Sequence, residues 1–202
     1  MQKIYFIFLI LVSGFLFAEY KNTNGVASEK SFADMLKWIR SDIEPKISKI
    51  ELSSEWKKLN LLEDDNYAVW IGHSTFLIKK NGVTILTDPI FSERASPFKN
   101  IGPKRLIPPA IELDVIPRID LVTISHNHYD HLDINSLKKI SKKHPNAIFL
   151  VPAGDEKLLV RKKINNVYNF SWWESFDALG FKFTFTPVQH WSKRSLFDRN
   201  KS

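Results

Sequence analysis

Two short runs rich in apolar residues, at residues 119–125 and 147–151, constrain the fold more than any other feature of this sequence. Runs of this length and composition are typical of strands that are buried on both faces of a sheet. Between them, residues 134–143 have the spacing of an amphipathic helix, with Leu137 and Ile140 on its apolar side. Strands that alternate with helices predict an α/β layered fold.

Segments on either side of this central unit extend the same pattern. Asn81-Gly82 is a hairpin signal between two runs rich in β-branched and apolar residues. Residues 90–117 hold five prolines and one glycine and show no clear period, which indicates a long loop. The further predicted elements are strands at residues 67–71, 75–79, 83–87 and 181–186 and a short basic helix at residues 155–163.

The chain divides into three parts by composition. Residues 1–18 form a signal peptide or membrane anchor, residues 19–65 a linker with a helical segment, and residues 66–202 the main domain. Within the second part, we expect helices from residue 31 to Pro45 and over residues 53–62.

Residues 4–18 are an uncharged stretch of 15 residues, shorter than the roughly 20 that span a bilayer. The stretch matches the apolar core of a secretory signal peptide, with Ala18 before the cleavage point. We therefore expect an exported protein, periplasmic or extracellular. Leu16 is not the small residue that cleavage sites prefer, so an uncleaved membrane anchor is the alternative.

Composition limits the chemistry available to this chain. The absence of cysteine excludes disulfides, thiolate metal sites and a thiol nucleophile, so a metal ion must be held by carboxylates and by the six histidines. The net charge is +7, but the basic residues come in short runs beside apolar ones. We interpret them as solvated outer faces of helices and strands, and we expect no nucleic-acid partner.

The strongest chemical signal is the segment that follows the apolar run at residues 119–125. Side chains two residues apart on an extended segment point the same way, so His126, His128 and Asp130 are expected to converge. His131 comes next, where the chain must turn, and it is expected at a second point close by. Three imidazoles and a carboxylate have no use in packing, because burying them unpaired is costly. They predict a divalent metal site.

Four other residues are candidates for the same site. His190 also follows a predicted strand and is expected to supply a third nitrogen. His73 is expected either to contact the metal ligands without binding the ion itself, or simply to form part of a turn. Asp88 and Asp133 are expected to accept a hydrogen bond from a ligand histidine, or else to cap a turn or helix.

Residues 125–133 resemble the H-x-H-x-D-H signature of the metallo-β-lactamase superfamily. Three further stretches are similar to the family of phospholipases D that hydrolyse N-acylphosphatidylethanolamine. These are residues 87–105, with Thr87-Asp88-Pro89 and Gly102-Pro103-Lys104-Arg105, residues 172–174, and residues 186–194. The resemblance extends over residues 67–201.

This resemblance implies an αβ/βα sandwich, here mainly its first half, preceded by N-terminal helices. It also implies two zinc ions, the first held by His126, His128 and His190 and the second in part by Asp130 and His131. The family's bridging aspartate and further histidine would follow His190, where 12 residues remain and none is histidine. We therefore expect a chain that is truncated after its third metal histidine.

The activity that the resemblance implies is cleavage of a phospholipid phosphodiester by a metal-activated hydroxide, with Asp130 orienting it, at a membrane surface. Ile90, Phe91, Phe98 and Ile101 are then expected to border a lipid groove, or else to anchor their loop. Two alternatives remain. One is a hydrolase of the same fold acting on another ester, a lactone or a nucleotide, and the other is an inactive metal-binding remnant.

Overall fold

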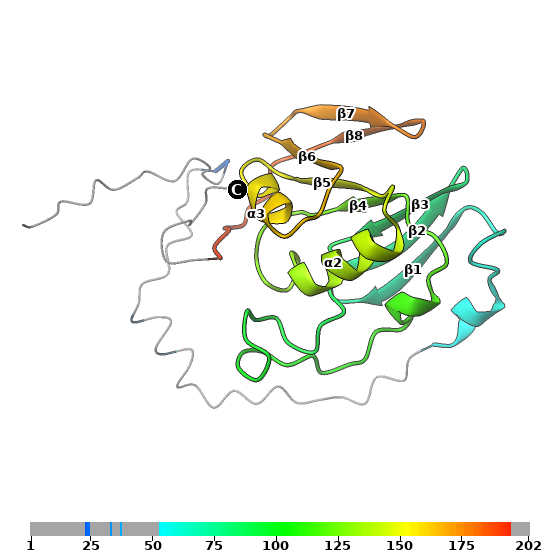
Figure 1. The fold of residues 1–202 in the computed structure, drawn as a ribbon, viewed down its shortest axis with the longest axis horizontal. Helices are drawn as coiled ribbons and strands as arrows, with labels where there is room; N and C mark the ends of the chain where they lie inside the picture. The colour runs from blue at the N-terminus through cyan, green and yellow to red at the C-terminus, as the bar shows by residue number, and fades with distance from the viewer. Residues whose placement is uncertain (1–22, 25–32, 34–36, 38–52, 195–202) are drawn as a thin grey trace, which may run out of the picture.

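The computed structural model describes residues 23–24, 33, 37 and 53–194 (Figure 1). The expected signal peptide or anchor at residues 1–18 and most of the helix expected from residue 31 lie outside these residues. Within them, no helix has the length and apolar character needed to cross a membrane.

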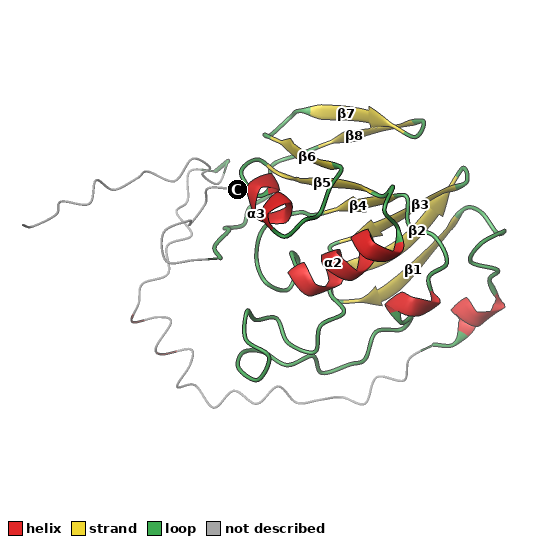
Figure 2. Ribbon diagram, viewed as in Figure 1, coloured by secondary structure: helices red, strands yellow, loops and turns green. Residues whose placement is uncertain are grey.

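One mixed sheet of six strands forms the centre of the fold, and a two-stranded hairpin lies beside it (Figure 2). In the large sheet the strands follow one another in chain order, with β1–β2–β3 antiparallel and β3–β4–β5–β6 parallel. Its strands are β1 (Tyr67–Gly72), β2 (Thr75–Lys80), β3 (Val83–Thr87), β4 (Leu121–Thr123), β5 (Ile148–Pro152) and β6 (Val167–Phe170), and the hairpin is β7 (Ser175–Ala178) with β8 (Phe181–Thr184).

The register of the sheet lines up a continuous apolar row on one face. Leu77 pairs with Leu86, Leu86 with Val122, Val122 with Phe149, and Phe149 with Val167. The first four of these side chains are buried, and Val167 packs against them. Because paired residues point to the same face, this row forms the floor of the hydrophobic core.

Two helices cover this row. In Figure 1, α2 (Ile134–Lys143) and α3 (Glu156–Arg161) lie on the same face of the sheet. Leu137 and Ile140 of α2 and Leu159 of α3 are fully buried in the same cluster as the strand residues. The parallel strands joined through these helices confirm the predicted α/β layering.

Several element boundaries differ from expectation. The helix expected over residues 53–62 is a single 3₁₀ turn, η1 (Glu55–Lys58), and a second one, η2 (Leu113–Val115), interrupts the long loop. The runs at residues 119–125 and 181–186 are strands only over β4 and β8. β6 and β7 were not expected, because each has only four residues and carries polar or exposed positions.

The hairpin β7–β8 docks against β6. The Phe176 ring of β7 lies 4.6 Å from the Tyr168 ring and 5.8 Å from the Phe170 ring, both on β6. A cavity of about 400 Å³ separates the hairpin from the second face of the large sheet, where Leu150, Thr123 and Thr87 line it. His126 and His190 also line this cavity.

Candidate metal centre

Three segments of the chain meet where β3 and β4 end. These parallel strands pair Thr87 with Thr123, so the residues that follow them emerge side by side. Asp88 follows β3, and its backbone N–H donates to the Thr123 carbonyl at 2.8 Å. The β1–β2 turn reaches the same edge, since β2 runs antiparallel to β3. The sheet therefore brings residues 73, 88 and 124–131 together.

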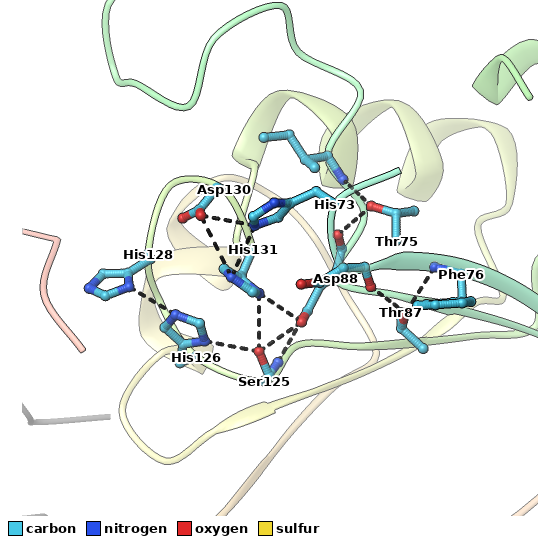
Figure 3. A network of polar contacts seen from close by, with 12 residues as sticks. His73, Thr75, Phe76, Thr87, Asp88, Ser125, His126, His128, Asp130 and His131 are labelled. Atoms are coloured by element: carbon cyan, nitrogen blue, oxygen red, sulfur yellow. Dashed lines mark hydrogen bonds and ion pairs between the residues drawn. The ribbon is translucent and has the colours of Figure 1, made fainter. Parts of the chain in front are cut away.

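His126, His128 and His190 form a first group of potential metal ligands, whose donor atoms lie within 4.8 Å of one another. His126 Nε2 and His128 Nδ1 are 2.9 Å apart (Figure 3). The centroid of the His190 ring lies 4.6 Å from that of His126 and 5.2 Å from that of His128. The loop after β4 and the segment after β8 thus bring their imidazoles to one point.

His73, Asp130 and His131 form a second group of the same kind. His73 Nε2 lies 2.9 Å from Asp130 Oδ2 and 3.3 Å from His131 Nε2, and the last distance, His131 Nε2 to Asp130 Oδ2, is 3.7 Å. Figure 3 shows these three side chains pointing toward one another. The two groups are adjacent, because the ring centroids of His126 and His131 are 4.0 Å apart.

Asp130 does not lie with His126 and His128, as an extended segment would have placed it. The chain turns at His128, whose carbonyl accepts hydrogen bonds from the N–H groups of His131 at 3.1 Å and Leu132 at 2.8 Å. In a turn, side chains two residues apart no longer share a side. The turn therefore directs Asp130 to the second group, beside His131.

The first group carries neutral imidazoles. Burial lowers the pKa of His126 to about 2 and that of His128 to about 4, and neighbouring imidazoles add to the effect. Burial also lowers the pKa of His190. A neutral ring keeps a lone pair for a metal ion, so these pKa shifts favour the ligand form.

The chemistry of this donor set fits a metal ion. His128 Nε2 is buried and has no hydrogen-bond partner among the described residues. The other ring nitrogen, His128 Nδ1, is the one that lies within the group, 2.9 Å from His126 Nε2. Imidazole nitrogens beside a carboxylate oxygen are the ligand types that zinc takes in proteins.

Asp88 orients His131 of the second group through the ring nitrogen that faces away from the group. Its Oδ2 accepts a hydrogen bond from His131 Nδ1 at 2.8 Å and from Ser125 Oγ at 2.7 Å, and its Oδ1 accepts from the Ser125 backbone N–H at 2.7 Å. Ser125 Oγ lies 2.9 Å from His126 Nδ1 and can accept its proton. With both Nδ1 atoms donating, the Nε2 atoms of His126 and His131 carry free lone pairs. Asp88 was expected in this position, whereas the role of Ser125 was not.

We predict that Asp88→Asn weakens zinc binding by about 10- to 100-fold, because an amide fixes the His131 tautomer less well than a carboxylate. Titration calorimetry of the metal-free chain with zinc chloride measures the effect. Asp120→Asn is the matched control, since Asp120 also accepts a backbone N–H, from Thr84, but belongs to neither donor group. Equal zinc affinity in the two variants would contradict this role for Asp88.

Asp133 does not support a ligand histidine as expected. It is the N-cap of α2, and its Oδ1 accepts from the Asn135 N–H at 3.0 Å. Its Oδ2 accepts from Ser136 Oγ at 2.5 Å and from the Ser92 N–H at 3.0 Å. The aspartate therefore caps a helix and fastens the long loop to it, which was the alternative left open.

Arg194 and Tyr129 hold the loop that carries the ligands, a role that the sequence did not reveal. Arg194 Nη1 donates to the carbonyls of Asn127 at 3.1 Å and Leu132 at 2.7 Å, one on each side of the turn. Its guanidinium lies 4.1 Å from the centre of the Tyr129 ring, and Tyr129 Oη donates to the Arg194 carbonyl at 3.0 Å. A cation over an aromatic ring stabilises this arrangement. Their wide separation in the chain gave no signal of the contact.

A second cavity, of about 560 Å³, opens beside the donor groups. His73, His128 and Asp130 are among the residues that line it. The other walls are largely apolar and come from β1 and the long loop, with Trp70, Ile90, Leu106 and Ile107 among them. Of the loop residues expected to border a groove, Ile90 does so. Phe91 packs against the core, and Phe98 and Ile101 are exposed and do not line either cavity described here.

Comparison with known proteins places these residues in context. Residues 83–202 match the family described as the beta-lactamase superfamily domain. An N-acyl-phosphatidylethanolamine-hydrolyzing phospholipase D 1 of Caenorhabditis elegans is 37% identical over 147 residues, 68% of this chain and 41% of that protein. A protein of Saccharomyces cerevisiae named as a mitochondrial N-acyl-phosphatidylethanolamine-hydrolyzing phospholipase D is 38% identical over 140 residues, 67% of this chain and 30% of that protein. A metal-dependent hydrolase of Aeropyrum pernix is 30% identical over 137 residues, 60% of this chain and 50% of that protein. The chain thus spans half or less of the length of these relatives.

The expected export is corrected by this comparison. The yeast relative is named as a mitochondrial protein, which does not indicate export to the periplasm or the cell exterior. The expectation, like the alternative of a membrane anchor, rested on residues 4–18, which lie outside the described residues. A short apolar run does not specify a destination, since runs of similar length also occur in buried and interfacial segments.

Proposed function

The chain belongs to the beta-lactamase superfamily, and on this basis we propose that it is a zinc-dependent phosphodiesterase acting on lipids that resemble N-acylphosphatidylethanolamine. Hydrolysis breaks the bond between phosphorus and the ethanolamine oxygen. Water supplies a hydroxyl group to phosphorus and a proton to that oxygen, which gives phosphatidic acid and an N-acylethanolamine. Two relatives at 37% and 38% identity carry this activity in their names and support this substrate class.

The observation that carries the proposal is the cavity of about 560 Å³. Donor side chains of both groups line it: His128 belongs to the first group, and His73 and Asp130 belong to the second. Trp70 and Leu106 in its apolar walls are 48% and 53% exposed, so apolar surface remains open beside a polar centre. A lipid phosphodiester has the matching chemistry, with an anionic phosphate next to long hydrocarbon chains.

The proposed roles of the side chains follow from their positions. His126, His128 and His190 hold one ion, and Asp130 and His131 belong to the site of a second. When bound, two zinc ions lower the pKa of a water molecule and neutralise charge that develops on the phosphate. Asp130, whose side chain is 39% exposed at the cavity wall, is placed to accept a hydrogen bond from the attacking water and orient it. Asp88 and Ser125 hold the imidazoles in the tautomers that this requires.

The test is a substrate panel with the untagged 202-residue chain loaded with zinc. We expect release of N-acylethanolamine from N-acylphosphatidylethanolamine in detergent micelles, and much slower cleavage of an N-acyl lactone and of a cyclic nucleotide. Activity confined to the lactone or the nucleotide would assign another substrate to the same fold. Zinc binding with no hydrolysis of any of the three would support the inactive metal-binding alternative.

A further inference from the structure

We propose that His73 is a ligand of the second metal site, which it completes as a three-donor set with Asp130 and His131. This inference deepens the proposed zinc site and rests on it. His73 comes from the β1–β2 turn, far upstream of the histidine motif. The resemblance to the phospholipase family instead implies that the remaining ligands of the second zinc follow His190.

The spacing of the three donor atoms supports a shared cation. His73 Nε2, Asp130 Oδ2 and His131 Nε2 are separated by 2.9, 3.3 and 3.7 Å. Ligands of a tetrahedral zinc ion, with bonds of about 2.0–2.2 Å, are separated from one another by about 3.3–3.6 Å. The three atoms therefore already have nearly the mutual distances that a bound ion requires.

Counting protons leads to the same inference. In the neutral ring whose Nδ1 donates to Asp88, His131 Nε2 faces the group as a lone pair. Asp130 Oδ2 is also an acceptor. His73 Nε2 has at most one proton, and at 2.9 Å the carboxylate is its nearer partner. One acceptor therefore remains without a positive partner, and a divalent cation would satisfy all three atoms.

The backbone around His73 holds its ring toward this point. Gly72 and His73 both have positive φ, 139° and 51°, where the β1–β2 register shifts between Trp70 and Gly72. Left-handed conformations cost a non-glycine residue of order 1 kcal/mol or more, and the surroundings must support them. Here Trp70 Nε1–H donates to the His73 carbonyl at 2.8 Å.

The next residues tie the turn to the other ligand-bearing segment. Thr87 Oγ1 donates to the Ser74 carbonyl, and Thr75 Oγ1 donates to the Asp88 carbonyl, both at 2.8 Å. The turn that carries His73 is therefore fastened to the residue that orients His131. A histidine left over in a solvated turn would not require such support.

Metal stoichiometry tests the inference without any substrate. The untagged, metal-free 202-residue chain is titrated with zinc chloride by calorimetry, and bound metal is counted by atomic emission after dialysis. We expect two equivalents for the unmodified chain, one for His73→Ala, one for His126→Ala and none for the double variant. His144→Ala is the control and is expected to keep two equivalents, because His144 is the C-cap of α2 and belongs to neither donor group.

Cobalt(II) gives an independent readout, because its visible absorption reports nitrogen and oxygen ligands directly. We expect the second-equivalent spectrum to be lost in His73→Ala, with thermal unfolding of the metal-free protein unchanged because the His73 side chain is 47% exposed. Two equivalents in His73→Ala, or a single equivalent in the unmodified chain, would overturn the inference. Two equivalents that depend on His73 but support no lipid cleavage would instead overturn the proposed function alone.

Discussion

His126→Ala is expected to lower kcat/KM for the lipid phosphodiester by about a thousandfold. His126 is the central ring of the site, with ring centroids 4.0 Å from that of His131 and 4.6 Å from those of His128 and His190. Removing the His126 imidazole leaves the first donor group with only His128 and His190. It also removes the ring that lies beside His131 of the second donor group. Loss of a metal ion that stabilises transition-state charge by several kcal/mol corresponds to a rate loss of this size, since about 4 kcal/mol is a factor of a thousand.

Steady-state kinetics with saturating zinc measures this effect, and His144→Ala serves again as the matched histidine control. The loss should appear mainly in kcat, because His126 lines the sheet-side cavity and not the one proposed for the lipid. Circular dichroism of the two variants checks that the fold is retained. A variant at His126 with more than a tenth of the original kcat/KM would show that this imidazole holds no catalytic metal ion.

The central part of the fold was predictable because its signals are local. The apolar runs that became β4 and β5 and the amphipathic pattern of α2 specify a parallel unit, and such a unit is buried on both faces. The Asn81-Gly82 signal likewise falls between β2 and β3, which pair as a hairpin. The predicted superfamily and α/β fold are confirmed by the family match over residues 83–202.

The ligand groups show what local patterns cannot specify. The motif 126–131 was recognisable by residue type alone, but the grouping of its side chains depends on a turn at His128 that an extended segment does not predict. His73 and Asp133 differ from their expected roles in opposite directions. His73 lies within the second donor group, where a supporting role or a plain turn was expected, while Asp133 caps a helix. The surroundings of His73 depend on contacts with the distant Asp130 and His131, which neither spacing nor composition records. Asp133 caps its own helix through local contacts with Asn135 and Ser136.

Phe149→Ala is expected to destabilise the domain by about 3–5 kcal/mol. Phe149 is 1% exposed in β5, between Val122 and Val167 in the apolar row, and it belongs to the same buried cluster as Leu137 and Leu159 of the covering helices. In a domain of this size, such a loss lowers the melting temperature by about 10 °C. Urea unfolding followed by circular dichroism gives the free energy directly.

Phe98→Ala provides the matched control, because it removes the same side chain from a loop position that is 62% exposed. We expect this change to alter the free energy of unfolding by less than about 0.5 kcal/mol. Equal effects of the two substitutions would mean that Phe149 is not enclosed between sheet and helices. The layered arrangement that positions residues 88 and 124–131 would then be wrong as well, because β3, β4 and β5 align these segments through the same buried row.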